Sequence, residues 1–235
     1  MKKTFVFLTA IFLSLCWAGS LFASDYGTTS ANFLKIPVAP VPAGLGQAYT
    51  AMYGTDSVLY NPGALAIMNY SSVSGAHAQY FSDMTQEYFA ANMRFDFGTI
   101  ALSYVSLSSG KFAGYQQTSG GPATDNPTGD ISAQFSSMAL SFSKSWPYFP
   151  EDRGMIDPMP ITPFWGKMEE VEDFRVKTYR LSLGATIKRV SEDLYETTAS
   201  TIGMDVGALL ILPGHWQFGA SALNYGGKIK HAYES

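Results

Sequence analysis

Apolar and polar side chains alternate repeatedly along this sequence. In residues 86–97, one side of the alternation carries Phe89, Ala91, Met93, Phe95 and Phe97. A period of two residues is the repeat of a β-strand, whose successive side chains point to opposite faces of a sheet. The same alternation predicts strands over residues 72–81, 99–107, 130–144, 173–190, 197–212 and 215–225. About seven antiparallel strands therefore predict an all-β protein.

Composition narrows the choice among all-β architectures. Only 14% of the residues are charged, whereas ordinary soluble domains have about 25%. No segment after residue 23 approaches the roughly 18 consecutive apolar residues that indicate a transmembrane helix. A transmembrane antiparallel β-barrel fits this composition, because its strands alternate between lipid and lumen. The alternative is a soluble, exported β-sandwich whose strands bury one face.

The N-terminal residues predict export. Lys2 and Lys3 precede an apolar run over residues 4–17, and small residues follow up to Ala23. This is the pattern of a secretory signal peptide, which we assign to residues 1–23. Together with the barrel, it predicts a location in the bacterial outer membrane, with outer-membrane lipid as a partner. Cys16 is the only cysteine, so the mature chain has no disulfide framework and no cysteine-ligated metal site.

Two segments interrupt the alternation. Residues 24–70 are rich in Gly, Ala and Pro and contain the turn signal Asn61-Pro62-Gly63, so they predict compact irregular or short helical structure. Residues 146–172 contain five prolines, and proline removes a hydrogen bond from a β-ladder. We predict a long connection there, with aromatic residues suited to partner docking. These aromatic residues are Trp146, Tyr148, Phe149, Phe164 and Trp165.

No motif predicts enzymatic, metal or nucleotide chemistry. Gly44-Leu45-Gly46 lacks the third glycine of a phosphate-binding loop. The three histidines lie far apart in the sequence, and there is no G-x-S-x-G nucleophile motif. We therefore expect no enzyme activity and no cofactor. The net charge is −4 and no basic block is present, which argues against nucleic acid as a partner.

The strand number raises a problem of closure. Single-chain bacterial barrels have even strand numbers, and an open sheet in lipid leaves edge N–H and C=O groups unpaired at several kcal/mol each. We therefore expect residues 71–235 to form the first half of a longer barrel, truncated here at its C-terminal side. Closure by a partner chain is the alternative.

Four motifs resemble the PorV/PorQ family of outer-membrane proteins, which is related to the FadL long-chain fatty acid transporter. The motifs are residues 27–36 (GTTSANFLKI), 43–51 (AGLGQAYTA), 59–66 (LYNPGALA) and 218–226 (FGASALNYG). The resemblance implies a FadL-like barrel of about fourteen strands, about seven of them present here. It also implies that residues 24–70 form an N-terminal plug, or hatch, in the lumen.

Within such a plug, the resemblance implies roles for particular residues. Asn61, Pro62 and Gly63 would form a turn directly before the first strand. Small side chains would let the plug fit a narrow lumen, and the candidates are Gly44, Gly46 and Ala48.

The resemblance also implies a function. We expect a non-enzymatic outer-membrane protein in envelope transport or in type IX-like protein secretion, with secretion or envelope proteins as partners. The alternative is a FadL-like uptake channel whose ligand is a long-chain fatty acid or another hydrophobic small molecule.

Overall fold

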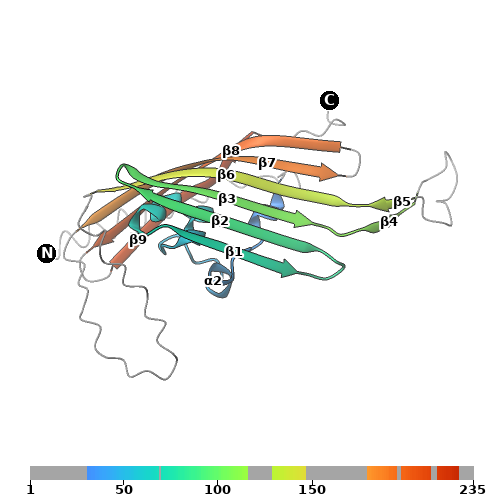
Figure 1. The fold of residues 1–235 in the computed structure, drawn as a ribbon, viewed down its shortest axis with the longest axis horizontal. Coiled ribbons are helices and arrows are strands. Elements are labelled where there is room, and N and C mark those ends of the chain that lie inside the picture. Colours follow the sequence, from blue (N-terminus) through green and yellow to red (C-terminus); the bar gives the residue numbers. More distant parts are fainter. Residues whose placement is uncertain are drawn as a thin grey trace, which may run out of the picture.

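The computed structural model describes residues 31–68, 70–115, 129–146, 179–194, 197–212 and 216–227. Most of them form one antiparallel sheet with the strand order β1-β2-β3-β6-β7-β8-β9 (Figure 1). The strands are β1 (Ser72–Gln79), β2 (Thr85–Phe95), β3 (Gly98–Ser108), β6 (Ala133–Trp146), β7 (Arg180–Leu194), β8 (Thr197–Leu212) and β9 (Trp216–Gly226). The predicted all-β class is confirmed. In the described part of the chain, β1 and β9 are the two edges of the sheet.

A short ribbon extends the connection between β3 and β6. It consists of β4 (Phe112–Gly114) and β5 (Gly129–Ile131), paired antiparallel, and it projects beyond the end of the sheet (Figure 1). The alternation predicted no strand over residues 112–114, and it assigned residues 130–131 to the same strand as β6 rather than to a separate ribbon. Strands of three residues are too short for a period of two to be visible in the sequence.

Several strand ends differ from the prediction. Trp146 is the last residue of β6 rather than the first residue of the connection that follows, and β7 continues to Leu194. β1 ends at Gln79 because Ser82 and Asp83 adopt left-handed φ values of 55° and 57°. Two consecutive left-handed residues make a tight hairpin turn that matches the twist of the strands.

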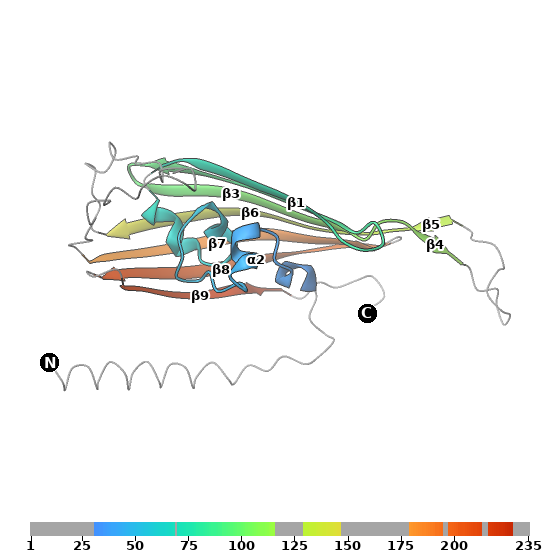
Figure 2. The ribbon, with the colours of Figure 1, turned by 90° about the horizontal axis from the view of Figure 1, so that it is seen from below.

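The N-terminal segment, which we define as residues 31–68, lies on one side of the sheet (Figures 1 and 2). Its elements are η2 (Asn32–Lys35), α2 (Pro40–Gly44), η3 (Thr55–Leu59) and η4 (Pro62–Ile67). Helices this short agree with the predicted irregular or short helical structure. Within the described ranges, no helix combines the length and the apolar character that crossing a bilayer requires.

The two faces of the sheet have opposite chemistry. We call the face under the N-terminal segment the inner face and the opposite one the outer face. On β2 the inner residues Tyr88 and Asn92 are 4% and 1% exposed, whereas the outer residues Phe89 and Met93 are 49% and 58% exposed. Buried polar and exposed large apolar side chains reverse the usual pattern of a water-soluble sheet. Other exposed outer-face residues are Leu102, Tyr104, Met138, Leu140, Phe142, Leu181, Leu183, Ile187, Ile202 and Met204.

The hydrophobic core lies between the N-terminal segment and the inner face. Ala64 and Ile67 of η4 contact Leu209 and Ile211 of β8 in one cluster. Leu65, which is fully buried, belongs to a second cluster on the inner face. Burying one such side chain contributes about 1.5–3 kcal/mol, so apolar contacts hold η4 against the sheet.

Candidate functional site

Asn61 anchors the N-terminal segment to the sheet. Its side chain is fully buried, and Oδ1 accepts a hydrogen bond from the Gly63 N–H at 3.0 Å, which caps the start of η4. Nδ2 donates to the carbonyl oxygens of Thr50, at 2.7 Å, and Ala208 of β8, at 2.9 Å. One amide side chain thus joins two parts of the N-terminal segment to the wall of the sheet.

Glycines in the sheet make room for this turn. A Cβ atom added at Gly207 of β8 would lie 2.0 Å from Asn61 Oδ1, and one at Gly184 of β7 would lie 2.4 Å from the Pro62 carbonyl oxygen. On β9, a Cβ atom at Gly219 would lie 2.1 Å from the Thr50 carbonyl oxygen. We call Gly184, Gly207 and Gly219 the glycine seat. Only glycine allows two backbones to approach this closely.

Serine hydroxyls of the sheet also bind the turn. The Gly63 carbonyl oxygen accepts hydrogen bonds from Ser143 Oγ of β6, at 3.1 Å, and from Ser182 Oγ of β7. Ser143 Oγ also accepts from the Ala66 N–H at 3.3 Å. Together with Gly184 and Gly207, these contacts fasten the Asn61-Pro62-Gly63 turn to β6, β7 and β8, while Gly219 of β9 lies against Thr50.

A second anchor joins the N-terminal segment to β1 and β2, at the opposite edge of the same sheet. The buried Asp56 of η3 accepts hydrogen bonds at Oδ1 from Ser74 Oγ of β1, at 2.6 Å, and from the Tyr88 hydroxyl of β2, at 3.1 Å. The pKa values of the Tyr49 and Tyr60 hydroxyls are raised above their ordinary range. Burial is the larger cause, and the nearby Asp56 carboxylate is the second. The segment therefore bridges strands that are distant within the sheet.

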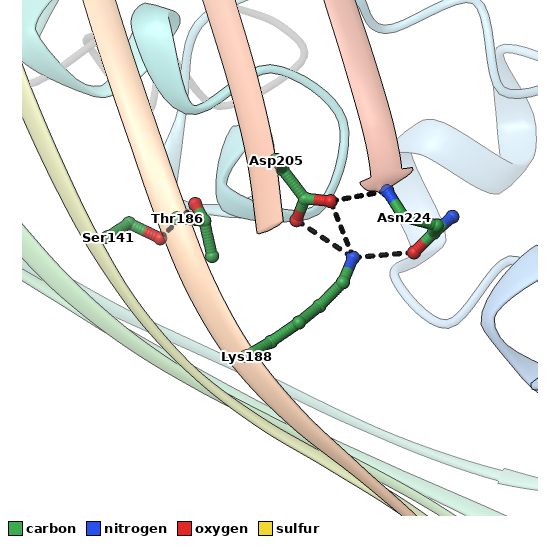
Figure 3. Close-up of polar contacts among 5 residues, drawn as sticks. All are labelled: Ser141, Thr186, Lys188, Asp205 and Asn224. Atoms are coloured by element: carbon green, nitrogen blue, oxygen red, sulfur yellow. Dashed lines mark hydrogen bonds and ion pairs between the residues drawn. The ribbon is translucent and has the colours of Figure 1, made fainter. Parts of the chain in front are cut away.

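A cluster built around a buried Lys188–Asp205 ion pair lies on the inner face beside the segment (Figure 3). Lys188 Nζ of β7 donates to both carboxylate oxygens of Asp205 of β8, at 2.7 and 2.8 Å, and to Asn224 Oδ1 at 2.5 Å. The Asn224 N–H donates to Asp205 Oδ1 at 2.6 Å, and Asn224 has a left-handed φ of 61°. The strand register shifts between Met204 and Val206, on either side of Asp205. The cluster thus stabilises a bulge between β8 and β9.

A cavity of about 330 Å³ lies between the N-terminal segment and the inner face. Its apolar wall comes mainly from the segment and contains Leu34, Ile36, Val38, Val58 and Leu59. Its polar wall comes from the sheet and contains Ser103, Ser137, Thr186, Lys188, Asp205 and Asn224. Volume and lining together suit an amphipathic small molecule.

Among the described residues, two lysines and one aspartate line this cavity, so its lining carries a net positive charge. The Lys188 ammonium is neutralised by the Asp205 carboxylate. Lys35 also lines the cavity, and its Nζ donates to the amide oxygen of Asn32 at 3.0 Å. Of the described residues that line the cavity, two are therefore cationic and one is anionic.

The structure places the residues singled out from the sequence in different surroundings. Asn61, Pro62 and Gly63 meet the sheet as described. Gly44, Gly46 and Ala48 are exposed, and a Cβ atom at either glycine would have no neighbour within 4 Å among the described residues. The expected close packing at Gly44 and Gly46 is therefore not observed. Gly46 instead has a left-handed φ of 60°, which glycine adopts without steric cost.

The candidate docking loop is mostly outside the described residues. Trp146 is 45% exposed at the end of β6, and Lys144 Nζ lies 5.7 Å from the centroid of its ring. Tyr148, Phe149, Phe164 and Trp165 fall outside the described ranges.

Sequence reasoning missed the glycine seat and the charged cluster. The available signal for the seat was glycine inside predicted strands, which often marks a close backbone approach. The cluster joins residues that are 17 and 36 positions apart, so strand pairing had to be known first.

Comparison with known proteins identifies no relative. No family model matches the chain, and neither a curated protein nor a solved structure matches it. In the described part of the chain, no group of three or more His, Cys, Asp or Glu side chains could hold a metal ion.

Proposed function

We propose that this chain forms part of the wall of an outer-membrane β-barrel of the PorV/PorQ type, with the N-terminal segment as a plug in the lumen. The observation that carries the proposal is the inverted sheet, which exposes large apolar side chains on its outer face and buries polar ones on its inner face. Water disfavours this arrangement, because large apolar surfaces remain hydrated. A bilayer favours it, because lipid covers the apolar face and the lumen receives the polar one.

The proposal requires partners for both edges of the sheet. β1 and β9 are edge strands in the described part of the chain, and each unpaired backbone group in lipid costs several kcal/mol. Further strands must therefore pair with β1 and β9, from additional chain or from a partner chain. A barrel of about fourteen strands needs about seven more.

Cell fractionation tests this architecture. The full-length protein, expressed with its signal peptide, should appear in the outer-membrane fraction and leave it only in detergent. Its gel mobility should change on heating, because a closed barrel keeps its compact shape until it is heated. Recovery of a monomer from a detergent-free periplasmic extract would reject the proposal in favour of a soluble sandwich.

The proposed role is non-enzymatic and lies in envelope transport or protein secretion. The four motifs that resemble the PorV/PorQ family support this role, and so does the exposed Trp146 where the long connection begins. Pull-downs with the full-length protein and with a variant lacking residues 147–172 test the docking loop. The shortened variant should lose envelope or secretion proteins that the intact protein binds, and identical partner sets would remove the loop from the proposal.

Uptake of an amphipathic small molecule is the second candidate function, and the cavity favours it. An apolar wall beside Lys35 fits a hydrophobic molecule with a carboxylate, such as a long-chain fatty acid. A deletion strain separates the two roles: loss of labelled fatty acid uptake indicates the channel, whereas loss of secreted proteins with normal uptake indicates secretion. Restoring the gene with Lys35→Ala should lower fatty acid uptake relative to the restored wild type. The matched control is Lys111→Ala, at an exposed site in the connection between β3 and β6.

A further inference from the structure

The polar and apolar residues of the outer face are separated along the strands. Two adjacent cross-strand rows contain no large apolar side chain. We call them the polar rows. The first consists of His77, Glu87, Ser106, Ser136, Ser191 and Ser200, and the second of Gln79, Thr85, Ser108, Gln134, Asp193 and Thr198. Both lie at the end of the sheet that carries the β1–β2 turn and the β4–β5 ribbon (Figure 1).

The composition changes at the next rows. We call the two rows beside the polar rows the apolar border. They consist of Gly75, Phe89, Tyr104, Met138, Arg189 and Ile202, followed by Val73, Ala91, Leu102, Leu140, Ile187 and Met204. Phe89, Met138 and Ile202 are 49%, 64% and 60% exposed. A change of this kind within one row spacing is what a boundary between two solvents produces.

Two polar contacts agree with a boundary at this position. In the first polar row, His77 Nδ1 lies 2.6 Å from Glu87 Oε1, and the two side chains are 60% and 53% exposed. An ionisable pair that faces acyl chains would be costly. Arg189 is the one charged residue in the apolar border, and its Nη2 reaches Ser200 Oγ of the first polar row at 3.5 Å. Long basic side chains extend in this way toward a polar interface.

We infer that the hydrocarbon layer ends between the apolar border and the polar rows, and that the polar rows lie in the lipid headgroup layer. This inference rests on the proposed outer-membrane barrel. It adds the depth of the protein: on β6, the boundary falls between Met138 and Ser136. From Met138 to Trp146 the strand covers about 26 Å at 3.3 Å per residue, or about 20 Å of depth at a tilt of about 40°, close to the roughly 25 Å apolar band of such barrels.

Single cysteines can locate the boundary, because Cys16 is the only cysteine and lies in the predicted signal peptide. Ser136→Cys, Met138→Cys and Leu140→Cys sit on one face of one strand, in three successive rows. Each full-length variant is placed in phospholipid vesicles and treated with a charged, membrane-impermeant maleimide, with detergent-solubilised protein as the reference. Ser200→Cys and Ile202→Cys repeat the comparison on β8.

The expected result is rapid labelling at residues 136 and 200 in vesicles. At residues 138, 140 and 202, labelling should be at least about tenfold slower in vesicles than in detergent, because the charged reagent is excluded from hydrocarbon. Protection at all positions, or labelling at 138 with protection at 140, would overturn the inferred boundary and leave the proposed barrel standing. Equal labelling in vesicles and detergent at all positions would overturn both, since no lipid would then cover this face.

Discussion

Replacing Asn61 tests whether the turn at the start of η4 holds the N-terminal segment in place. Asn61→Ala removes three hydrogen bonds, to the Gly63 N–H and to the Thr50 and Ala208 carbonyls. A net contribution of about 1 kcal/mol for each bond, together with the desolvation of buried groups left unpaired, gives a loss of about 3–4 kcal/mol. The matched control is Asn32→Ala, at an exposed position of the same segment, which should cost less than about 0.5 kcal/mol.

Hydrogen exchange of the full-length protein in detergent measures this loss. The loss should lower the protection of residues 48–68 by about two to three orders of magnitude, while the strands keep theirs. Asn61→Asp should be at least as damaging, because a carboxylate would face the two carbonyl oxygens that now accept from Nδ2. Less than a tenfold change in Asn61→Ala, or an equal change in Asn32→Ala, would refute the reasoning.

A double mutant separates this contact from general loosening of the fold. Gly207→Ala alone should displace the turn, because its Cβ atom would lie 2.0 Å from Asn61 Oδ1. Part of that clash disappears once Asn61 is alanine. The double mutant should therefore lose about 1–3 kcal/mol less than the sum of the single mutants, and strict additivity would show that the two residues do not meet.

Three further predictions concern the outer face, the charged cluster and alkaline pH. Leu140→Arg should cost about 2–4 kcal/mol of folding free energy in vesicles, whereas Gln134→Arg, about 20 Å along the same strand, should cost about 0–1 kcal/mol. Urea titration measures both free energies. Equal costs would contradict a lipid-facing band. Lys188→Met leaves the buried Asp205 carboxylate without its ion-pair partner and should cost about 3–5 kcal/mol of folding free energy. The control Lys111→Met, which breaks an exposed ion pair, should cost less than about 1 kcal/mol. Similar denaturation midpoints for the two variants would count against a structural role of the cluster. Burial raises the pKa of Tyr60, so the folded state favours the neutral hydroxyl. The resulting contribution to folding stability is complete below about pH 10, and it declines as the pH rises further. Tyr60→Phe should therefore weaken the alkaline loss of stability in a pH series of denaturation midpoints, and an unchanged series would contradict the assignment.

Local pattern accounts for most of what could be predicted of the fold. Alternation on β2, β3, β6 and β8 extends over at least eleven residues, so the period of two is unmistakable. The same signal fails for β4 and β5, which have three residues each. The Asn61-Pro62-Gly63 turn was also visible, because proline and glycine restrict or free the backbone locally.

The candidate site depended on strand register and could not be predicted in the same way. Gly44 and Gly46 drew attention as a pair in a small-residue tract, yet the close approaches occur at Gly184, Gly207 and Gly219. In the sequence, these three glycines are distinguished only by lying inside predicted strands. They become a seat only because β7, β8 and β9 are aligned so that all three lie under the N-terminal segment.

Neighbouring residues are enough to specify antiparallel strands with one apolar and one polar side, because the alternation is a local pattern. The folded chain was needed to show which side the N-terminal segment covers, which glycines lie against it, and that Lys188 meets Asp205 and Asn224. Those outcomes follow from contacts between residues far apart in the chain. Their distances are set by strand pairing, which alternation alone leaves undetermined.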